Sequence, residues 1–142
     1  MTVAIVNVCI DPRLDHESIR GQARVRLERL GLRADRVFVT NEPGGNAGSA
    51  LRGAIELVGR QREAIVLAAV LHHDDCIAAS EGMRRPLAES GRALGELLKT
   101  RDPRAVVLTG SVFTQSGAIV WTDEPSKSLE RFPFRMPSML GR

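Results

Sequence analysis

The feature that most constrains the fold is a run of eight consecutive apolar residues at positions 64–71, Ala-Ile-Val-Leu-Ala-Ala-Val-Leu. Such a run is too short to span a membrane, and it is typical of a central β-strand covered on both faces. Shorter apolar runs that predict three more strands lie at residues 2–8, 36–40 and 105–109. The sequence therefore predicts a sheet with this run at its centre.

Three segments outside these strands show apolar residues at helical spacing. They lie at residues 16–30, 47–62 and 85–100. Strands that alternate with helices predict a parallel sheet with right-handed crossovers. A closing hairpin is expected over residues 112–122, around Gln115-Ser116-Gly117. We therefore expect an α/β fold: a mostly parallel four-stranded sheet flanked by helices, with an added C-terminal antiparallel strand.

The chain of 142 residues is expected to form one α/β domain over residues 1–124. Residues 125–142 contain three prolines and several large apolar side chains, which predicts an irregular tail that packs on the body or on a partner subunit. The sequence shows neither a signal peptide nor a membrane span, so we expect a cytoplasmic protein with no membrane partner. A net charge of +3, four Phe, one Trp and no Tyr argue against a nucleic-acid partner.

Both cysteines of the chain lie in short motifs that contain metal-ligand residues. Cys9 follows the first predicted strand and opens a C-x-D-x-R motif with Asp11 and Arg13, and Cys76 closes an H-x-x-C motif with His73. Two thiolates and one imidazole are a ligand set of catalytic zinc sites, in which a fourth position stays open. Because the carboxyl ends of parallel strands meet at one edge of a sheet, we expect the two motifs to lie close together.

Each motif also has a plainer interpretation. A lone Cys9 fits a small buried hydrophobe, and Asp11 with Arg13 fits a turn-stabilising ion pair. His72 is an alternative ligand to His73, although it points to the other face if the strand continues. The two cysteines could also act as a redox dithiol, although they do not form a C-x-x-C pair.

Two further stretches have alternative interpretations. Residues 44–48, Gly-Gly-Asn-Ala-Gly, open the second predicted helix. They fit either an anion-binding helix N-terminus or a helix cap provided by Asn46. Asp74 and Asp75 fit either supporting roles beside a metal site or solvated loop carboxylates.

Taken together, C-x-D-x-R after the first strand, N-A-G opening the second helix and H-x-x-C after the third strand resemble the β-class carbonic anhydrases. The segment at residues 112–121 is similar to the closing strand of that family. The resemblance implies Zn²⁺ held by Cys9, His73 and Cys76, with Asp11 and Arg13 as the catalytic gating dyad. It also implies reversible hydration of carbon dioxide to bicarbonate by a zinc-bound hydroxide, in a homodimer or a higher even oligomer.

The sequence departs from that family in four places. Only eight residues precede Cys9, so we expect the family's N-terminal helical arm to be missing. Ile77 stands where a glycine usually follows the second cysteine, and Gly45 stands where an arginine usually precedes Asn-Ala. Aromatic residues that could line the family's substrate pocket are few, and Phe38 is one candidate. The alternatives are hydrolysis of carbonyl sulfide or carbon disulfide at the same site, or a non-catalytic zinc-binding dimeric module.

Overall fold

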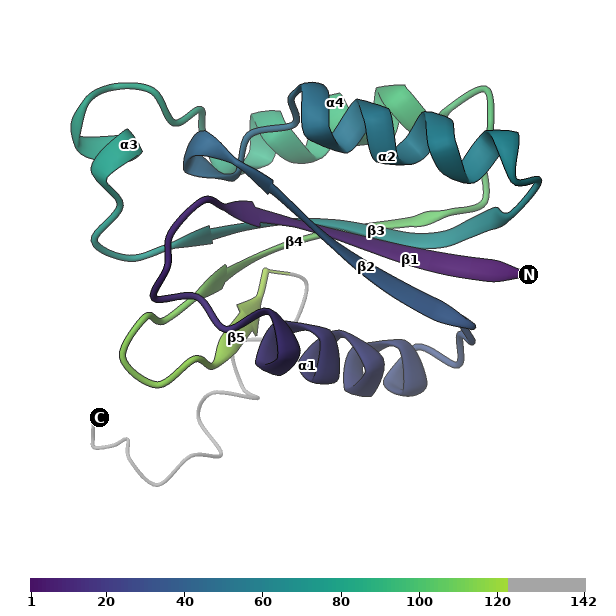
Figure 1. Ribbon diagram of the computed structural model, residues 1–142, viewed down its shortest axis with the longest axis horizontal. Helices are drawn as coiled ribbons and strands as arrows, with labels where there is room; N and C mark the ends of the chain where they lie inside the picture. Colours follow the sequence, from purple (N-terminus) through teal and green to yellow (C-terminus); the bar gives the residue numbers. More distant parts are fainter. Residues whose placement is uncertain (123–142) are drawn as a thin grey trace.

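The computed structural model describes residues 1–122, which form a five-stranded sheet with helices on both faces (Figure 1). The strands are β1 (Thr2–Cys9), β2 (Arg36–Glu42), β3 (Ala64–His73), β4 (Val106–Val112) and β5 (Ile119–Trp121). Their order in the sheet is β2-β1-β3-β4-β5. The first four strands are parallel, and β5 pairs antiparallel with β4. The predicted fold class is therefore confirmed, including the added antiparallel strand.

The helices cover the two faces of the sheet unequally. They are α1 (His16–Arg29), α2 (Ser49–Arg60), α3 (Ile77–Ser80) and α4 (Leu87–Leu98), with a short 3-10 turn at Pro43–Gly45. Helices α2 and α4 lie together on one face, and α1 lies on the other (Figure 1). The short α3 lies beyond the carboxyl end of β3 and was not predicted, because four residues are too few to show a helical period.

The core is divided by the sheet into two apolar clusters. Neighbouring residues of β3 point to opposite faces, so Val70 and Leu71 are both fully buried but belong to different clusters. Helix α1 buries Ile19, Ala23 and Leu27, whereas α2 buries Leu51, Ile55 and Val58. Burial of one such Leu or Val side chain contributes roughly 1.5–3 kcal/mol to the stability of the fold. Because β3 supplies buried residues to both clusters, this central strand links the two halves of the core.

The ends of α1 follow from local sequence. The Asp15 side chain caps the helix and accepts hydrogen bonds from the backbone N–H of Glu17 at 3.0 Å and of Ser18 at 3.4 Å. At the other end Gly31 has a φ of 69°, a conformation that glycine adopts at low cost. The first predicted helix is therefore confirmed with its boundaries shifted by one residue at the C-terminal end.

The start of α2 differs from both sequence interpretations. The helix begins at Ser49, and no side chain of its preceding loop caps it. Instead the buried carboxylate of Glu42, at the end of β2, accepts a hydrogen bond from the N–H of Ala50. The chain's own carboxylate thus takes the place of an external anion, and Asn46 bonds elsewhere. Both the external-anion interpretation and the Asn46 cap are wrong.

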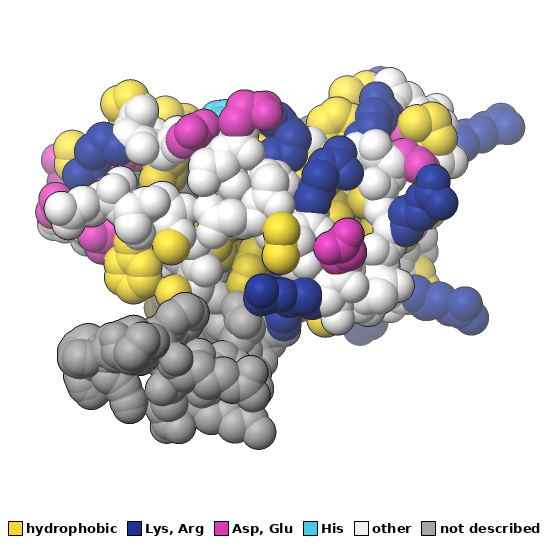
Figure 2. All heavy atoms as spheres, turned by 90° about the horizontal axis from the view of Figure 1, so that it is seen from below, with side chains coloured by type: hydrophobic (Ala, Val, Ile, Leu, Met, Phe, Trp, Pro, Cys, Tyr) yellow, Lys and Arg dark blue, Asp and Glu magenta, His cyan; other side chains and the backbone are white. Residues whose placement is uncertain are grey.

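None of the helices in the described part of the chain has the length and apolar character needed to cross a bilayer. On the face that carries α1, basic side chains are interspersed with acidic and hydrophobic ones rather than forming one continuous patch (Figure 2). The predicted tail at residues 125–142, and with it the domain boundary at residue 124, lies outside the described residues.

Candidate metal centre

The three predicted metal ligands come together at the carboxyl ends of β1 and β3. Cys9 is the last residue of β1, His73 is the last residue of β3, and Cys76 lies in the loop just before α3. Their ligand atoms all lie within 4.8 Å of one another, and the two Sγ atoms are 3.8 Å apart. All three residues are buried. Because β1 and β3 are parallel neighbours in the sheet, their ends place residues far apart in sequence beside one another.

The hydrogen bonding of His73 fixes which ring nitrogen is available to a ligand. Its Nδ1 lies 2.6 Å from the backbone carbonyl oxygen of Asp74. A carbonyl can only accept, so Nδ1 carries the proton and Nε2 of the neutral ring keeps its lone pair. This Nε2 is buried and has no hydrogen-bond partner. A buried nitrogen without a partner is costly, and this tautomer is typical of metal-binding histidines.

His72, the alternative ligand, is not part of this cluster. The two histidines are consecutive residues of β3, so their side chains point to opposite faces of the sheet. Burial lowers the pKa of His72 to about 4, and the positive charge of Arg84 adds to this effect. His72 is therefore a neutral buried side chain at ordinary pH.

The Cys9 sulfur accepts one hydrogen bond from the backbone. The N–H of Gly44, in the loop after β2, lies 3.3 Å from Cys9 Sγ. Burial raises the pKa of the Cys9 thiol above its usual value, while the Gly44 N–H acts in the opposite direction. Neither cysteine forms a disulfide. Two free thiols beside an imidazole nitrogen without a hydrogen-bond partner are a donor set that fits zinc.

Asp11 lies beside the same cluster and is held by Arg13. Arg13 Nη2 is 2.8 Å from Asp11 Oδ2, and Arg13 Nε is 3.1 Å from Oδ1. This two-pronged contact lowers the pKa of Asp11 to about 2, so the carboxylate is charged at neutral pH. Asp11 Oδ2 also lies 3.6 Å from His73 Nε2. The predicted ion pair is thus present, and it places a fixed negative charge at the edge of the ligand cluster.

A cleft of about 660 Å³ opens onto these groups. Its polar lining includes Cys9, Asp11 and Arg13. Its apolar lining consists of Ile10, Pro12, Pro43, Ile77, Ala78 and Met83. Ile77 is 71% exposed and lies at the mouth, so it makes the entrance apolar rather than filling the space beside the ligands.

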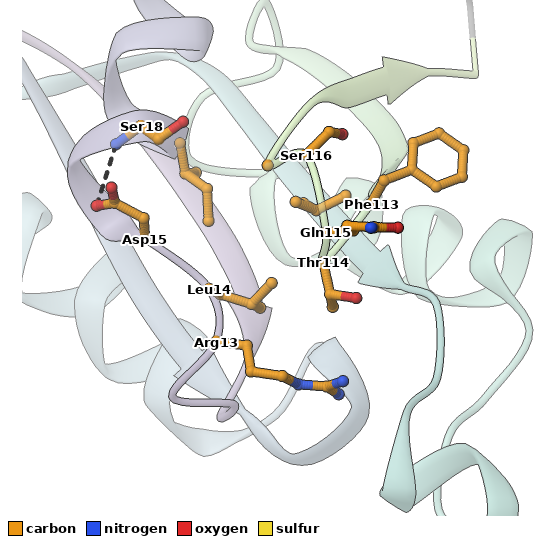
Figure 3. Close-up of a pocket in the computed structure, with 11 residues that line it drawn as sticks. Arg13, Leu14, Asp15, Ser18, Phe113, Thr114, Gln115 and Ser116 are labelled. Atoms are coloured by element: carbon orange, nitrogen blue, oxygen red, sulfur yellow. Dashed lines mark hydrogen bonds between the residues drawn. The ribbon is translucent and has the colours of Figure 1, made fainter.

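A smaller pocket of about 220 Å³ lies on the other side of Arg13, between the start of α1 and the β4–β5 turn (Figure 3). Figure 3 shows Leu14 facing the turn that carries Thr114, with Arg13 at one end of the pocket. The turn is tied to the metal-ligand loop, because the N–H of Thr114 donates to Asp74 Oδ1 at 2.8 Å. This hydrogen bond lowers the pKa of Asp74 below its usual value. Asp74 is therefore a structural link, not merely a solvated carboxylate.

Sequence reasoning missed two residues that support the cluster, Arg84 and Asn7, and named Gly45 without its structural role. Arg84 donates to the carbonyl oxygen of His73 at 3.0 Å. Asn7 lies fully buried in β1. The sequence signal that could have identified it is its place as a single polar amide inside an apolar run. Gly45 has a φ of 73°, and a Cβ there would come well inside 3.0 Å of the Leu71 carbonyl oxygen. In this conformation of the loop, position 45 has no room for a side chain.

Known structures share this architecture. A carbonic anhydrase from Streptococcus mutans superposes with a TM-score of 0.53 at 19% identity, covering 84% of this chain and 81% of that one. A β-carbonic anhydrase of the fungal pathogen Aspergillus fumigatus gives 0.53 at 18% identity, covering 89% and 78%. The apo form of a carbon disulfide hydrolase gives 0.51 at 13% identity, covering 91% and 83%.

These similarities establish the fold. No protein-family model matches the sequence, and no curated protein matches it either. The chain has the β-carbonic anhydrase-like fold that its motifs predict, at low sequence identity.

Proposed function

We propose that this protein is a zinc-dependent lyase that catalyses the reversible hydration of carbon dioxide to bicarbonate. The observation that carries the proposal is the meeting of three buried ligand atoms with a charged carboxylate. Cys9, His73 and Cys76 have their ligand atoms within 4.8 Å of one another, and Asp11 lies 3.6 Å from His73 Nε2. A purely structural zinc site needs neither an open position nor an adjacent carboxylate held by arginine.

The donors that would hold zinc are Cys9 Sγ, Cys76 Sγ and His73 Nε2. Zinc at such a set of donors makes hydroxide available near neutral pH, because it lowers the pKa of water from about 15.7 to roughly 7. The carbonyl of Asp74 fixes the His73 ring with Nε2 turned to the cluster. The Gly44 N–H stabilises negative charge on Cys9.

Asp11 is the residue that we assign to orienting the nucleophile. It is charged at neutral pH and has both oxygens engaged by Arg13, so its position is fixed. In this position Asp11 accepts a hydrogen bond from the attacking hydroxyl group and directs its oxygen lone pair toward the carbon of the substrate. Arg13 acts by holding Asp11 and keeping it ionised.

The walls of the cleft suit a small uncharged substrate. Ile10, Ile77 and Met83 give its mouth an apolar lining, which carbon dioxide can enter without losing hydrogen bonds. The same lining suits carbonyl sulfide or carbon disulfide. Similarity in fold to a carbon disulfide hydrolase favours these as a second candidate class of substrate.

Parallel assays on one preparation separate the two substrate classes. Bicarbonate formation from carbon dioxide and hydrogen sulfide formation from carbonyl sulfide or carbon disulfide are measured on protein of known zinc content. We expect bicarbonate formation to be the faster reaction. Hydrogen sulfide as the dominant product would show that the substrate belongs to the second class and is not carbon dioxide. Zinc-loaded protein that converts none of the three compounds would indicate a non-catalytic module.

We also propose that the chain acts as a homodimer or higher even oligomer in the cytoplasm, where a reducing environment keeps both cysteines free to bind metal. Three large apolar side chains around the cleft are exposed: Ile10 by 62%, Ile77 by 71% and Met83 by 52%. Such a cluster favours burial against a second subunit. Sedimentation equilibrium of the wild type and of Ile10→Asp tests this, with a dimer expected for the first and a weakened one for the second.

A further inference from the structure

Asn7 is a polar side chain in the middle of an apolar strand. Its neighbours Val6 and Val8 are fully buried, and Asn7 itself has no exposed surface. Burial of an amide in such surroundings is costly unless its polar atoms find partners. The hydrogen bonds of Asn7 therefore indicate why a polar residue stands here.

All three hydrogen bonds of Asn7 reach residues distant in sequence. Its Nδ2 donates to the carbonyl oxygens of Gly45 at 3.0 Å and Asn46 at 2.8 Å. Its Oδ1 accepts from the hydroxyl of Thr40 at 2.8 Å. Both N–H donors of the amide are used, and both hold the same loop, which connects β2 to α2.

The loop that Asn7 holds is the one that contacts Cys9. Residues two apart in a strand face the same side, so Asn7 and Cys9 both face this loop. Gly44 and Gly45 in the loop have φ values of 70° and 73°, which lets the backbone lie close against the sheet edge. In this conformation the Gly44 N–H points at Cys9 Sγ at 3.3 Å.

The same loop is fastened to the segment that follows Cys76. Asn46 Nδ2 donates to the carbonyl oxygen of Met83 at 2.8 Å, and Asn46 Oδ1 accepts from the N–H of Arg85 at 3.0 Å. The loop held by Asn7 therefore contacts Cys9 directly and is bonded to the segment that follows Cys76. Loss of its anchor on β1 would loosen the surroundings of Cys9.

We propose that Asn7 is a positioning residue for the metal centre: it holds the β2–α2 loop so that the Gly44 N–H donates to Cys9 Sγ, and it thereby strengthens zinc binding. This inference rests on the proposed function, since it concerns the zinc that Cys9 would bind. A hydrogen bond to a coordinating sulfur stabilises its negative charge, and outer partners of this kind affect metal affinity about 10- to 100-fold.

The first test compares zinc affinity by chelator competition in Asn7→Leu and in Thr40→Val. Asn7→Leu removes both donors to the loop at similar volume, and we expect it to weaken zinc binding at least about 10-fold. Thr40→Val removes only the hydroxyl that donates to Asn7 and leaves both loop hydrogen bonds, so we expect affinity close to that of the wild type. A folded Asn7→Leu protein, verified by circular dichroism, that binds zinc as tightly as the wild type overturns the proposal.

The second test begins with the wild-type protein, where its result does not depend on a variant that folds. In protein loaded with ¹¹³Cd, a hydrogen bond from the Gly44 N–H to a coordinating sulfur transmits a scalar coupling between the Gly44 amide proton and the metal. We expect this coupling in the wild type and its loss in Asn7→Leu. Metal bound without the coupling overturns the role of Asn7 while leaving the metal site intact. A wild-type protein that binds neither zinc nor cadmium overturns the proposed function itself.

Discussion

Arg13 donates hydrogen bonds to the Asp11 carboxylate from both its side chain and its backbone. The side-chain Nη2 lies 2.8 Å from Asp11 Oδ2, and Nε lies 3.1 Å from Oδ1. The backbone N–H of Arg13 adds a third hydrogen bond to Oδ1 at 2.9 Å. These contacts keep the carboxylate charged and fixed, with Oδ2 3.6 Å from His73 Nε2. The predictions about catalysis follow from this arrangement.

Asp11→Asn should separate zinc binding from turnover. The amide keeps the size of the side chain but lacks the charge and one acceptor oxygen, so it cannot orient the nucleophile in the same way. We expect zinc content near that of the wild type and turnover of carbon dioxide at least about 100-fold lower. Stopped-flow assays on metal-quantified protein measure both. Asp75→Asn, which alters an exposed carboxylate that also contacts Arg13, is the matched control. Undiminished turnover in Asp11→Asn would rule out its assigned role.

Removal of a proposed ligand should remove the metal. Cys9→Ser and His73→Ala each delete one of the three buried donors, and two remaining donors bind zinc far more weakly. We expect both variants to lose most of their zinc, measured by plasma mass spectrometry after dialysis. His72→Gln changes the neighbouring histidine on the opposite face and should keep its zinc. Full zinc content in either ligand variant contradicts the assignment.

Gly45 should be intolerant of any side chain. It combines a φ of 73° with a Cβ position well inside 3.0 Å of the Leu71 carbonyl oxygen. Gly45→Ala should lower the free energy of unfolding by about 2 kcal/mol or more, since it adds backbone strain to a steric conflict. Gly21→Ala is the matched control, because Gly21 lies in α1 with nothing within 4 Å of its Cβ position. By urea denaturation, the free energy of unfolding of this control should equal that of the wild type or exceed it by up to about 1 kcal/mol.

His72 should make the fold less stable in mild acid. Its pKa is about 4 in the folded protein, below the ordinary histidine value of 6.5 that applies in the unfolded chain. Between these two values the unfolded chain takes up a proton that the folded chain does not, so the free energy of unfolding falls as pH falls. The slope from this one group is at most about 1.4 kcal/mol per pH unit. Urea denaturation of EDTA-treated protein should show a flatter pH dependence for His72→Gln, and an unchanged slope would contradict the shift.

The strands and their neighbours could be predicted because they depend on local apolar patterns. The end of β3 was placed two residues early, since its apolar run stops at Leu71 while pairing with β4 continues through His73. The meeting of Cys9 with His73 could also be predicted, because parallel strands end at a common edge. The support from Asn7 could not, because its partners Gly45 and Asn46 lie 38 and 39 residues away and are backbone atoms without a sequence signature.

The most direct test of the account is the stopped-flow rate of carbon dioxide hydration per bound zinc, measured between about pH 7 and 9. We expect a rate that is proportional to zinc content, rises with pH across this range and disappears when the metal is removed by a chelator. Fully zinc-loaded protein that hydrates carbon dioxide no faster than the buffer alone would contradict it.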